Sequence, residues 1–201
     1  MNIYRIQNGV LVYCKPGAFS LEKQMQTLIE NNLQEISELE VVKSEFIIKN
    51  KRIDTLAFNS RLKAFVIIEY KREKNYSVID QGIAYLKFML ENKADFLLEF
   101  NEKKCSSLTR KEINWKNSYI IFAAPKFTEH QKNAASYKDL RIILWVVKLY
   151  GDSILAISEI INNTHSDDDF QHSKQIPETG KTQSWQTDTL WNEIKIIGKR
   201  N

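Results

Sequence analysis

Residues 53–90 combine two short apolar segments with a helical one, and this arrangement most restricts how the chain can fold. Residues 53–58 and 64–71 are rich in β-branched and aromatic side chains, with polar residues between them. Such segments are typical of two antiparallel strands joined by a short turn. From about residue 75 to residue 92 the apolar side chains recur at helical spacing. We therefore predict a β-hairpin followed directly by a helix.

Charged side chains occur at one end of this hairpin, where a buried strand normally excludes them. Alternation places Glu69 and Lys71 on one face of the second strand and Tyr70 on the other. In the expected pairing, Asp54 of the first strand lies opposite this end. Two close carboxylates repel each other unless a proton or a cation lies between them, and such oxygen ligands suit Mg²⁺ or Mn²⁺. A divalent metal site is one interpretation, and a structural ion pair is the alternative.

The spacing of these residues resembles a known signature. Asp54, followed after a gap of 14 residues by Glu69-Tyr70-Lys71, is similar to the Asp…Glu-x-Lys motif of the PD-(D/E)XK nuclease superfamily. Ile53 stands where the name of the superfamily has proline, a departure that does not touch the chemistry.

The helix that follows resembles the Gln-containing helix of the RecB-like and NucS-like branches of this superfamily. Gln81 and Tyr85 are four residues apart, so they share one face of the helix. The resemblance covers roughly residues 20–150.

The resemblance implies an α/β fold with a restriction-endonuclease-like mixed β-sheet flanked by helices. It also implies a Mg²⁺- or Mn²⁺-dependent DNA endonuclease that hydrolyses phosphodiester bonds with an activated water. Asp54, Glu69 and the main-chain carbonyl of Tyr70 would hold the metal. Lys71 would position the water, and Gln81 would hold Lys71 or the phosphate.

A third acidic ligand often comes from the first helix in this superfamily. Residues 21–36 show helical spacing of apolar side chains, with Glu22 and Glu30 on the flanks of the apolar stripe. The resemblance favours Glu22 as the metal ligand and Glu30 as the second choice. A solvent-facing carboxylate is the alternative for each.

The segment around the proposed site is basic. Residues 43–74 contain nine Lys or Arg and four Asp or Glu residues, an excess that suits a phosphate-binding surface. We expect Arg52, Arg72, Lys74 and Tyr85 to contact nucleic acid. The alternatives are that lysine-rich turns serve solubility and that the tyrosine packs in the core.

The 201 residues suit one domain with an appendage. We predict a nuclease-like domain over residues 1–161 and a flexible polar linker with a short C-terminal helix over residues 162–201. An N-terminal β-hairpin is expected because Asn8-Gly9 separates two apolar segments. Residues 94–100 fit a helix or a strand. Further strands are expected at residues 41–48, 118–125, 140–149 and 153–160, with a short helix at 127–137.

Several functional classes are excluded by composition. No run approaches the roughly 18 apolar residues of a membrane span, and the N-terminus does not resemble a signal peptide. Cys14 and Cys105 fit no zinc spacing and are expected to be reduced in a cytoplasmic protein. The three histidines form no predicted cluster, and no glycine-rich phosphate loop is present.

Two functions from different classes remain. The first is the Mg²⁺-dependent endonuclease, acting on single- or double-stranded DNA and not on membranes, with RNA as a further substrate class. A homodimer is favoured if both strands of a duplex are cut. The second is a catalytically silent nuclease-fold module that binds nucleic acid or regulates a partner.

Overall fold

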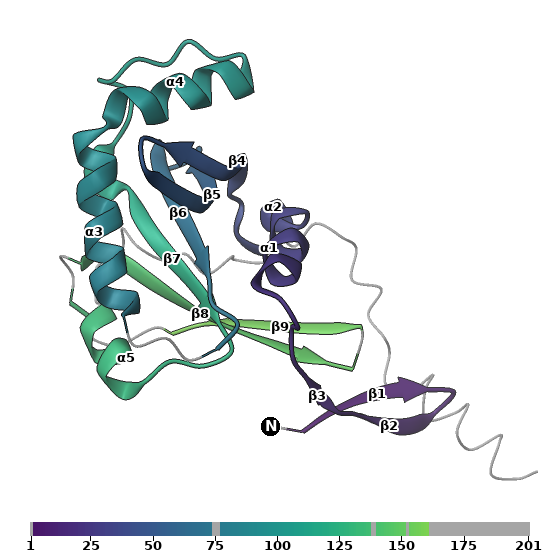
Figure 1. The fold of residues 1–201 in the computed structure, drawn as a ribbon. Helices are drawn as coiled ribbons and strands as arrows, with labels where there is room; N and C mark the ends of the chain where they lie inside the picture. The colour runs from purple at the N-terminus through teal and green to yellow at the C-terminus, as the bar shows by residue number, and fades with distance from the viewer. Residues whose placement is uncertain (1, 74–76, 138–139, 152, 161–201) are drawn as a thin grey trace, which may run out of the picture. The chain divides into compact units, whose positions relative to one another are not determined.

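A mixed β-sheet runs through the part of the chain that the computed structural model describes, residues 2–73, 77–137, 140–151 and 153–160 (Figure 1). Seven strands form this sheet: β3 (Pro16–Gly17), β4 (Glu40–Ile48), β5 (Lys51–Asn59), β6 (Ala64–Tyr70), β7 (Tyr119–Ala124), β8 (Ile142–Tyr150) and β9 (Ile154–Glu159). Their order is β3-β8-β7-β6-β5-β4, and β9 also pairs with β8.

Strand direction changes at β6, which has an antiparallel neighbour on one side and a parallel neighbour on the other. Strands β4, β5 and β6 form an antiparallel meander. Strands β6, β7 and β8 are parallel, and β9 returns antiparallel to β8. Parallel neighbours need crossover connections, which the helices between them supply. The predicted hairpin of residues 53–71 and the further predicted strands are therefore confirmed.

Helices cover both faces of the sheet. They are α1 (Glu22–Glu30), α2 (Leu33–Ser37), α3 (Val78–Glu91), α4 (Lys93–Lys104), the 3₁₀ turn η1 (Trp115–Asn117) and α5 (Glu129–Ala135). Helices α1 and α2 lie on one face, and α3 and α4 lie on the other (Figure 1). The helix predicted over residues 21–36 is two helices, and residues 94–100 are helical.

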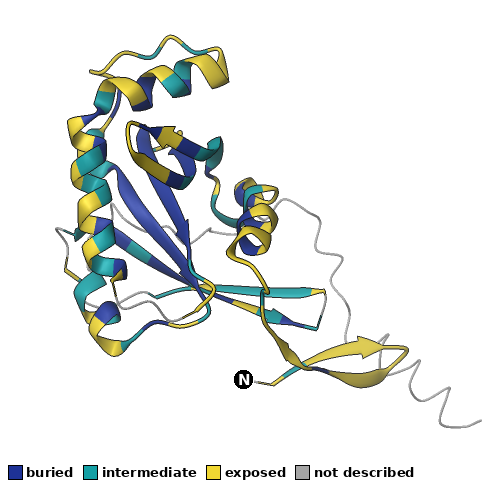
Figure 2. Cartoon of the chain, viewed as in Figure 1, coloured by how far each residue is buried: buried dark blue, intermediate teal, exposed yellow. Residues whose placement is uncertain are grey.

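The core has one layer on each face of the sheet, and the central strands are buried throughout (Figure 2). On the α3–α4 side, aromatic rings pack around Phe65, which stacks on Trp115 at a centroid distance of 5.3 Å. On the α1 side, Met25 and Ile29 pack against β6 residues such as Tyr70. Successive side chains of β6 therefore enter the two core layers in turn, as the sequence predicts.

Gly82 lets α3 approach the sheet closely. A Cβ atom at this position would lie 2.7 Å from Ile142 Cδ1 and 3.1 Å from Phe122 Cε2, which is closer than ordinary contact. Because residue 82 has no side chain, α3 packs directly on β7 and β8. The preceding residue, Gln81, is thereby held beside the end of β6.

The N-terminal hairpin forms a sheet of its own. Strands β1 (Ile3–Gln7) and β2 (Val10–Cys14) pair antiparallel with each other. Asn8 and Gly9 connect them with φ angles of +50° and +78°, the left-handed pair that a tight hairpin turn requires. The predicted hairpin is confirmed.

Both cysteines are free, with Cys14 buried and Cys105 exposed, as expected. In the described ranges, no helix is both long and apolar enough to cross a bilayer. The linker and short helix predicted over residues 162–201 lie outside the described residues.

Candidate active site

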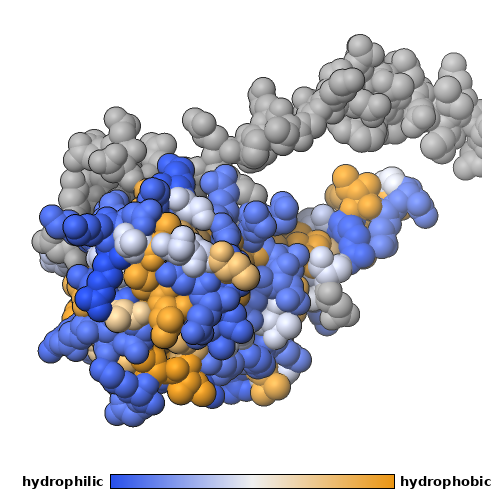
Figure 3. Space-filling view, turned by 90° about the horizontal axis from the view of Figure 1, so that it is seen from above, coloured by the Kyte–Doolittle hydropathy of each residue, from blue (hydrophilic) through white to orange (hydrophobic). Residues whose placement is uncertain are grey.

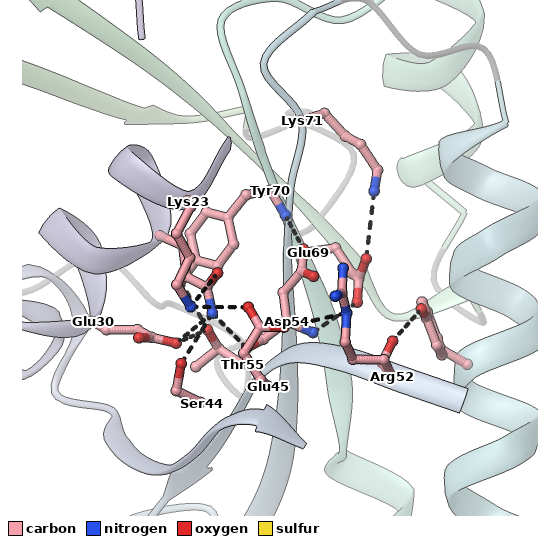
Figure 4. Close-up of polar contacts among 12 residues, drawn as sticks. Lys23, Glu30, Ser44, Glu45, Arg52, Asp54, Thr55, Glu69, Tyr70 and Lys71 are labelled. Atoms are coloured by element: carbon pink, nitrogen blue, oxygen red, sulfur yellow. Dashed lines mark hydrogen bonds and ion pairs between the residues drawn. The ribbon is translucent and has the colours of Figure 1, made fainter. Parts of the chain in front are cut away.

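The two predicted carboxylates meet where strands β5 and β6 stop pairing. The last register pair is Thr55 with Ile68, and one residue further Asp54 lies opposite Glu69. Side chains replace the strand ladder here: Asp54 N–H donates to Glu69 Oε1 at 3.3 Å, and Tyr70 N–H donates to Asp54 Oδ2 at 3.1 Å (Figure 4). The predicted position of Asp54 is confirmed, and its metal-binding role stays a prediction.

The other carboxylate oxygen of Glu69 binds two of the predicted site residues. Lys71 Nζ lies 3.4 Å from Glu69 Oε2, and Gln81 Nε2 donates to the same oxygen at 3.2 Å. The Glu69 residue is 2% exposed, so these contacts occur away from bulk water. We expected Gln81 to hold Lys71 or a phosphate. In the structure it holds the carboxylate instead.

The pair of carboxylates carries more negative charge than its surroundings balance. The pKa of Glu69 is raised to about 7, mainly by burial and also by the charge of Asp54, while Lys71 opposes both effects. Burial also raises the pKa of Asp54, although the amide of Tyr70 stabilises its ionised form. At neutral pH the pair therefore retains a share of a proton. A divalent cation would displace this proton and satisfy both carboxylates.

The donor set fits a hydrated divalent cation. Among the described residues, no group of three His, Cys, Asp or Glu side chains is placed to hold a metal. Mg²⁺ commonly binds through one or two carboxylates and keeps several waters. Asp54 and Glu69 match that requirement, with the carbonyl of Tyr70 as the further predicted ligand. The Tyr70 ring lies on the opposite face of the sheet, where its hydroxyl is hydrogen-bonded to Thr55 Oγ1 at 3.2 Å.

The predicted third acids do not join this pair. Glu22 Oε1 accepts a hydrogen bond from Arg72 N–H at 2.9 Å, one residue beyond Lys71. Glu30 accepts a hydrogen bond from the hydroxyl of Thr55, in the network that contains the Tyr70 hydroxyl (Figure 4). Each carboxylate is engaged elsewhere.

Two of the predicted nucleic-acid contacts lie together beside the site. Arg52 Nε forms an ion pair with Glu45 Oε2 at 3.2 Å, and 65% of the arginine side chain is exposed. Tyr85 Oη donates to the carbonyl of Arg52 at 3.0 Å. Burial raises the pKa of Tyr85 to about 12, so it stays a neutral donor. This tyrosine therefore tethers α3 to β5, and packing accounts for part of its role.

Arg72 lies just beyond the end of β6. Its guanidinium forms an ion pair with Glu73 at 2.9 Å and donates to the carbonyl of Ser20 at 2.8 Å. The side chain is about half exposed, so a phosphate could reach it. Lys74, the remaining predicted contact, lies outside the described residues.

Gln26 supports the site from α1, and the sequence pattern alone did not predict this role. It is 3% exposed, and its amide nitrogen lies 2.7 Å from the carbonyl oxygen of Asp54 and 2.9 Å from Glu30 Oε1. The Ser44 hydroxyl is 3.1 Å away. Gln26 lies three residues before Ile29, on the apolar stripe of α1. A polar residue in that stripe was the signal that could have identified it.

Glu45, directly opposite Asp54, interrupts the side-chain alternation of strand β4 without shifting its register. Its φ angle is +52°, a left-handed conformation that costs a non-glycine residue roughly 1–2 kcal/mol. The neighbouring Ser44 contacts α1, whereas Phe46 enters the aromatic core, so the alternation of β4 is interrupted here. The hydrogen bond from Lys23 is the main cause that lowers the pKa of Glu45. Its charge adds to the repulsion at Asp54.

Comparison with known proteins gives a sequence relative without an assigned activity. No protein-family profile matches the chain. An uncharacterised protein of Haemophilus influenzae is 48% identical over 166 residues, which make up 83% of this chain and 55% of the relative. The chain therefore spans about half the length of the curated relative it matches.

Solved structures with a related arrangement include a repair endonuclease from Pyrococcus abyssi, with 19% identity, a TM-score of 0.43, and coverage of 64% of this chain and 47% of that one. EndoMS in a complex with dsDNA also has 19% identity and a TM-score of 0.43, covering 63% and 46%. SfsA from Pyrococcus furiosus with Ca²⁺ has 18% identity and a TM-score of 0.32, covering 70% and 74%. Likeness at this level carries no argument about activity, so we infer function from the side chains of the site.

The raised pKa of Glu69 predicts a specific pH dependence of stability. Between about 4.5 and about 7, the folded Glu69 binds more protons than it does in the unfolded chain, so the free energy of unfolding decreases as the pH rises. Glu69→Gln, which does not titrate, should flatten this decrease. Urea unfolding of the metal-free protein and the variant across this window measures the difference. Equally steep curves for both proteins would contradict the raised pKa.

The buried amide of Gln26 predicts a second effect. Gln26→Leu keeps a similar volume but leaves the carbonyl of Asp54 and the carboxylate of Glu30 without this donor. We expect a loss of about 1–3 kcal/mol in the free energy of unfolding. Gln34→Leu, at an exposed position of α2, is the matched control and should change stability by less than about 0.5 kcal/mol. Equal effects of the two substitutions would show that the Gln26 hydrogen bonds contribute nothing.

Proposed function

We propose that this chain is a Mg²⁺-dependent endonuclease that hydrolyses phosphodiester bonds in DNA. The observation that supports this most is the adjacency of the partly buried Asp54 and the buried Glu69, both with raised pKa values, beside the ammonium of Lys71. Removing these charged side chains from water does little to stabilise the sheet, because desolvation of charges is costly. A cation-binding role explains why the charges lie together.

Asp54 and Glu69 would hold the cation with the main-chain carbonyl of Tyr70. When bound, the cation supplies Lewis-acid stabilisation of the charge that develops on the attacked phosphate. Gln81 fixes the orientation of Glu69 by binding Oε2, and the amide of Tyr70 fixes Asp54. Both carboxylates are therefore held in place before a ligand arrives.

Lys71 would act on the attacking water or on a phosphate oxygen. Its side chain is 14% exposed, so the ammonium is at the border between the buried pair and solvent. Hydrolysis joins the water oxygen to phosphorus and breaks one P–O ester bond, and the released sugar hydroxyl takes a proton. Arg52, two residues before Asp54, and Arg72, next to Lys71, would bind phosphates along the nucleic-acid backbone.

One observation favours the alternative of a catalytically silent nuclease-fold module. The charged groups around the site bind one another: Lys71 and Gln81 contact Glu69, and Arg52 pairs with Glu45. A closed network of this kind needs no metal to satisfy its hydrogen bonds. Such a module would bind nucleic acid or regulate a partner without cleaving it.

Cleavage assays test the catalytic assignment. The chain should nick supercoiled DNA or cut single-stranded DNA with Mg²⁺ or Mn²⁺, and Asp54→Ala or Lys71→Ala should reduce the rate by at least about 100-fold. Asp95→Ala and Lys87→Ala, which alter exposed residues of α4 and α3, are matched controls that should retain activity. Cleavage that survives both site substitutions would rule out this assignment. An RNA oligonucleotide assayed in parallel identifies an RNA-directed enzyme.

Metal binding separates the enzyme from the silent module without any substrate. Thermal melting with increasing Mg²⁺ or Mn²⁺ should show stabilisation of about 2.7 kcal/mol at a concentration 100 times Kd. The double variant Asp54→Asn, Glu69→Gln should lose this stabilisation and remain folded. A parent protein that melts identically with and without both metals would support the silent module.

A further inference from the structure

A group of hydrogen-bonded side chains lies behind the carboxylate pair, on the α1 face of the sheet. The Glu30 carboxylate of α1 accepts a hydrogen bond from Gln26 Nε2 at 2.9 Å and another from the Thr55 hydroxyl of β5. Thr55 Oγ1 in turn lies 3.2 Å from Tyr70 Oη of β6. Figure 4 shows Glu30, Thr55 and the Tyr70 ring close together beside α1 and apart from Lys71. We refer to Gln26, Glu30, Thr55 and Tyr70 as the rear network.

The rear network is buried within an apolar layer. Gln26 is 3% exposed and Thr55 and Tyr70 are 0% exposed, and the neighbouring Met25 and Ile29 are apolar. Most hydrophilic side chains instead lie at the surface, which is predominantly hydrophilic in the view of Figure 3. Buried hydrogen-bonded groups often stabilise a fold no more than apolar groups of the same shape. Packing alone therefore does not explain the polar groups at this place.

The rear network is attached to the backbone segments that carry the proposed cation ligands. Gln26 Nε2 donates to the carbonyl of Asp54 at 2.7 Å, and Thr55 is the next residue of β5. Tyr70 carries the main-chain carbonyl proposed as a ligand, and its amide donates to Asp54 Oδ2 at 3.1 Å. The last register pair of the two strands is Thr55 with Ile68. Beyond this pair, side-chain hydrogen bonds hold the segments together, and the rear network supplies those on the α1 face.

We propose that the hydroxyls of Thr55 and Tyr70, anchored on Glu30, are positioning groups for the divalent cation. They do not contact the cation themselves. They hold the ends of β5 and β6 at a fixed separation, so that the carboxylate of Asp54 and the carbonyl of Tyr70 stay in place before the cation binds. Loss of supporting partners of this kind typically reduces metal affinity by about 10- to 100-fold. The inference rests on the proposed function, because it requires a cation at Asp54 and Glu69.

A second buried tyrosine in the same core layer provides a matched control. Tyr119 of β7 is 2% exposed, and its hydroxyl accepts a hydrogen bond from Asn59 Nδ2 at 3.4 Å. It lies opposite Val66 in the register of β6, four residues before Tyr70. Removal of the Tyr119 hydroxyl therefore breaks a buried hydrogen bond of this layer without touching the segments that carry the proposed ligands.

Isothermal titration calorimetry of Mn²⁺ into the metal-free full chain tests the proposal without a substrate. Tyr70→Phe and Thr55→Val each remove a neutral hydroxyl, so neither substitution changes the charge of the site. Each should raise the Kd for Mn²⁺ by at least about 10-fold, whereas Tyr119→Phe should leave it within about twofold of the parent value. Far-UV circular dichroism should be the same for the parent and the three variants.

Melting temperatures distinguish a positioning role from a structural one. Tyr70→Phe and Tyr119→Phe should lower the melting temperature to a similar extent, because each loses a buried hydrogen bond. Only Tyr70→Phe should also weaken Mn²⁺ binding. Thr55→Val repeats the test from the other strand, so the proposal does not depend on the folding of a single variant.

Two results would overturn the inference while leaving the proposed function standing. One is a parent that binds Mn²⁺ and folded Tyr70→Phe and Thr55→Val variants that bind it equally tightly. The other is a Tyr119→Phe variant that weakens binding as much as they do, because the effect would then belong to the whole core layer. A parent without measurable Mn²⁺ binding is a different result, which overturns the cation site of the proposed function and the positioning role with it.

Discussion

The reciprocal hydrogen bonds at the end of the β5–β6 pairing are the interaction on which the rest of the site depends. The carboxylate of Glu69 accepts the amide proton of Asp54, and the carboxylate of Asp54 accepts that of Tyr70. Each acid thereby satisfies a backbone donor that the separating strands leave without a partner. The same geometry keeps two negative charges close together in a partly buried place. One local feature therefore satisfies the two backbone amides and also brings the two negative charges together.

Support for this feature comes from both faces of the sheet. Gln26 of α1 binds the carbonyl of Asp54 from one side, and Gln81 of α3 binds the carboxylate of Glu69 from the other. Gly82 allows α3 to lie close enough for the second contact. The left-handed Glu45 interrupts β4 beside Asp54, at an energetic cost that the surrounding packing offsets. The site therefore belongs to the sheet and both helix layers together.

Much of the fold and part of the site could be predicted from residue patterns. Alternation along residues 64–70 correctly separated the face of Glu69 from that of Tyr70, because side-chain direction in a strand follows from position alone. The roles of Gln26 and Glu45 could not be predicted in this way. Gln26 acts through a carbonyl 28 residues away in sequence. The left-handed conformation of Glu45 is a tertiary distortion that no local propensity requires.

The sequence by itself determined the hairpins, the buried central strands, and the meeting of Asp54 with the end of β6, since these follow from short-range periodicity and turn chemistry. Only the tertiary structure decided which polar groups satisfy one another. It directed Gln81 to Glu69, Glu22 to the amide of Arg72 and Glu30 to Thr55. The physical reason is that a hydrogen bond forms only when the donor–acceptor distance is right to within a few tenths of an ångström. Helix packing sets this distance, and spacing along the chain does not.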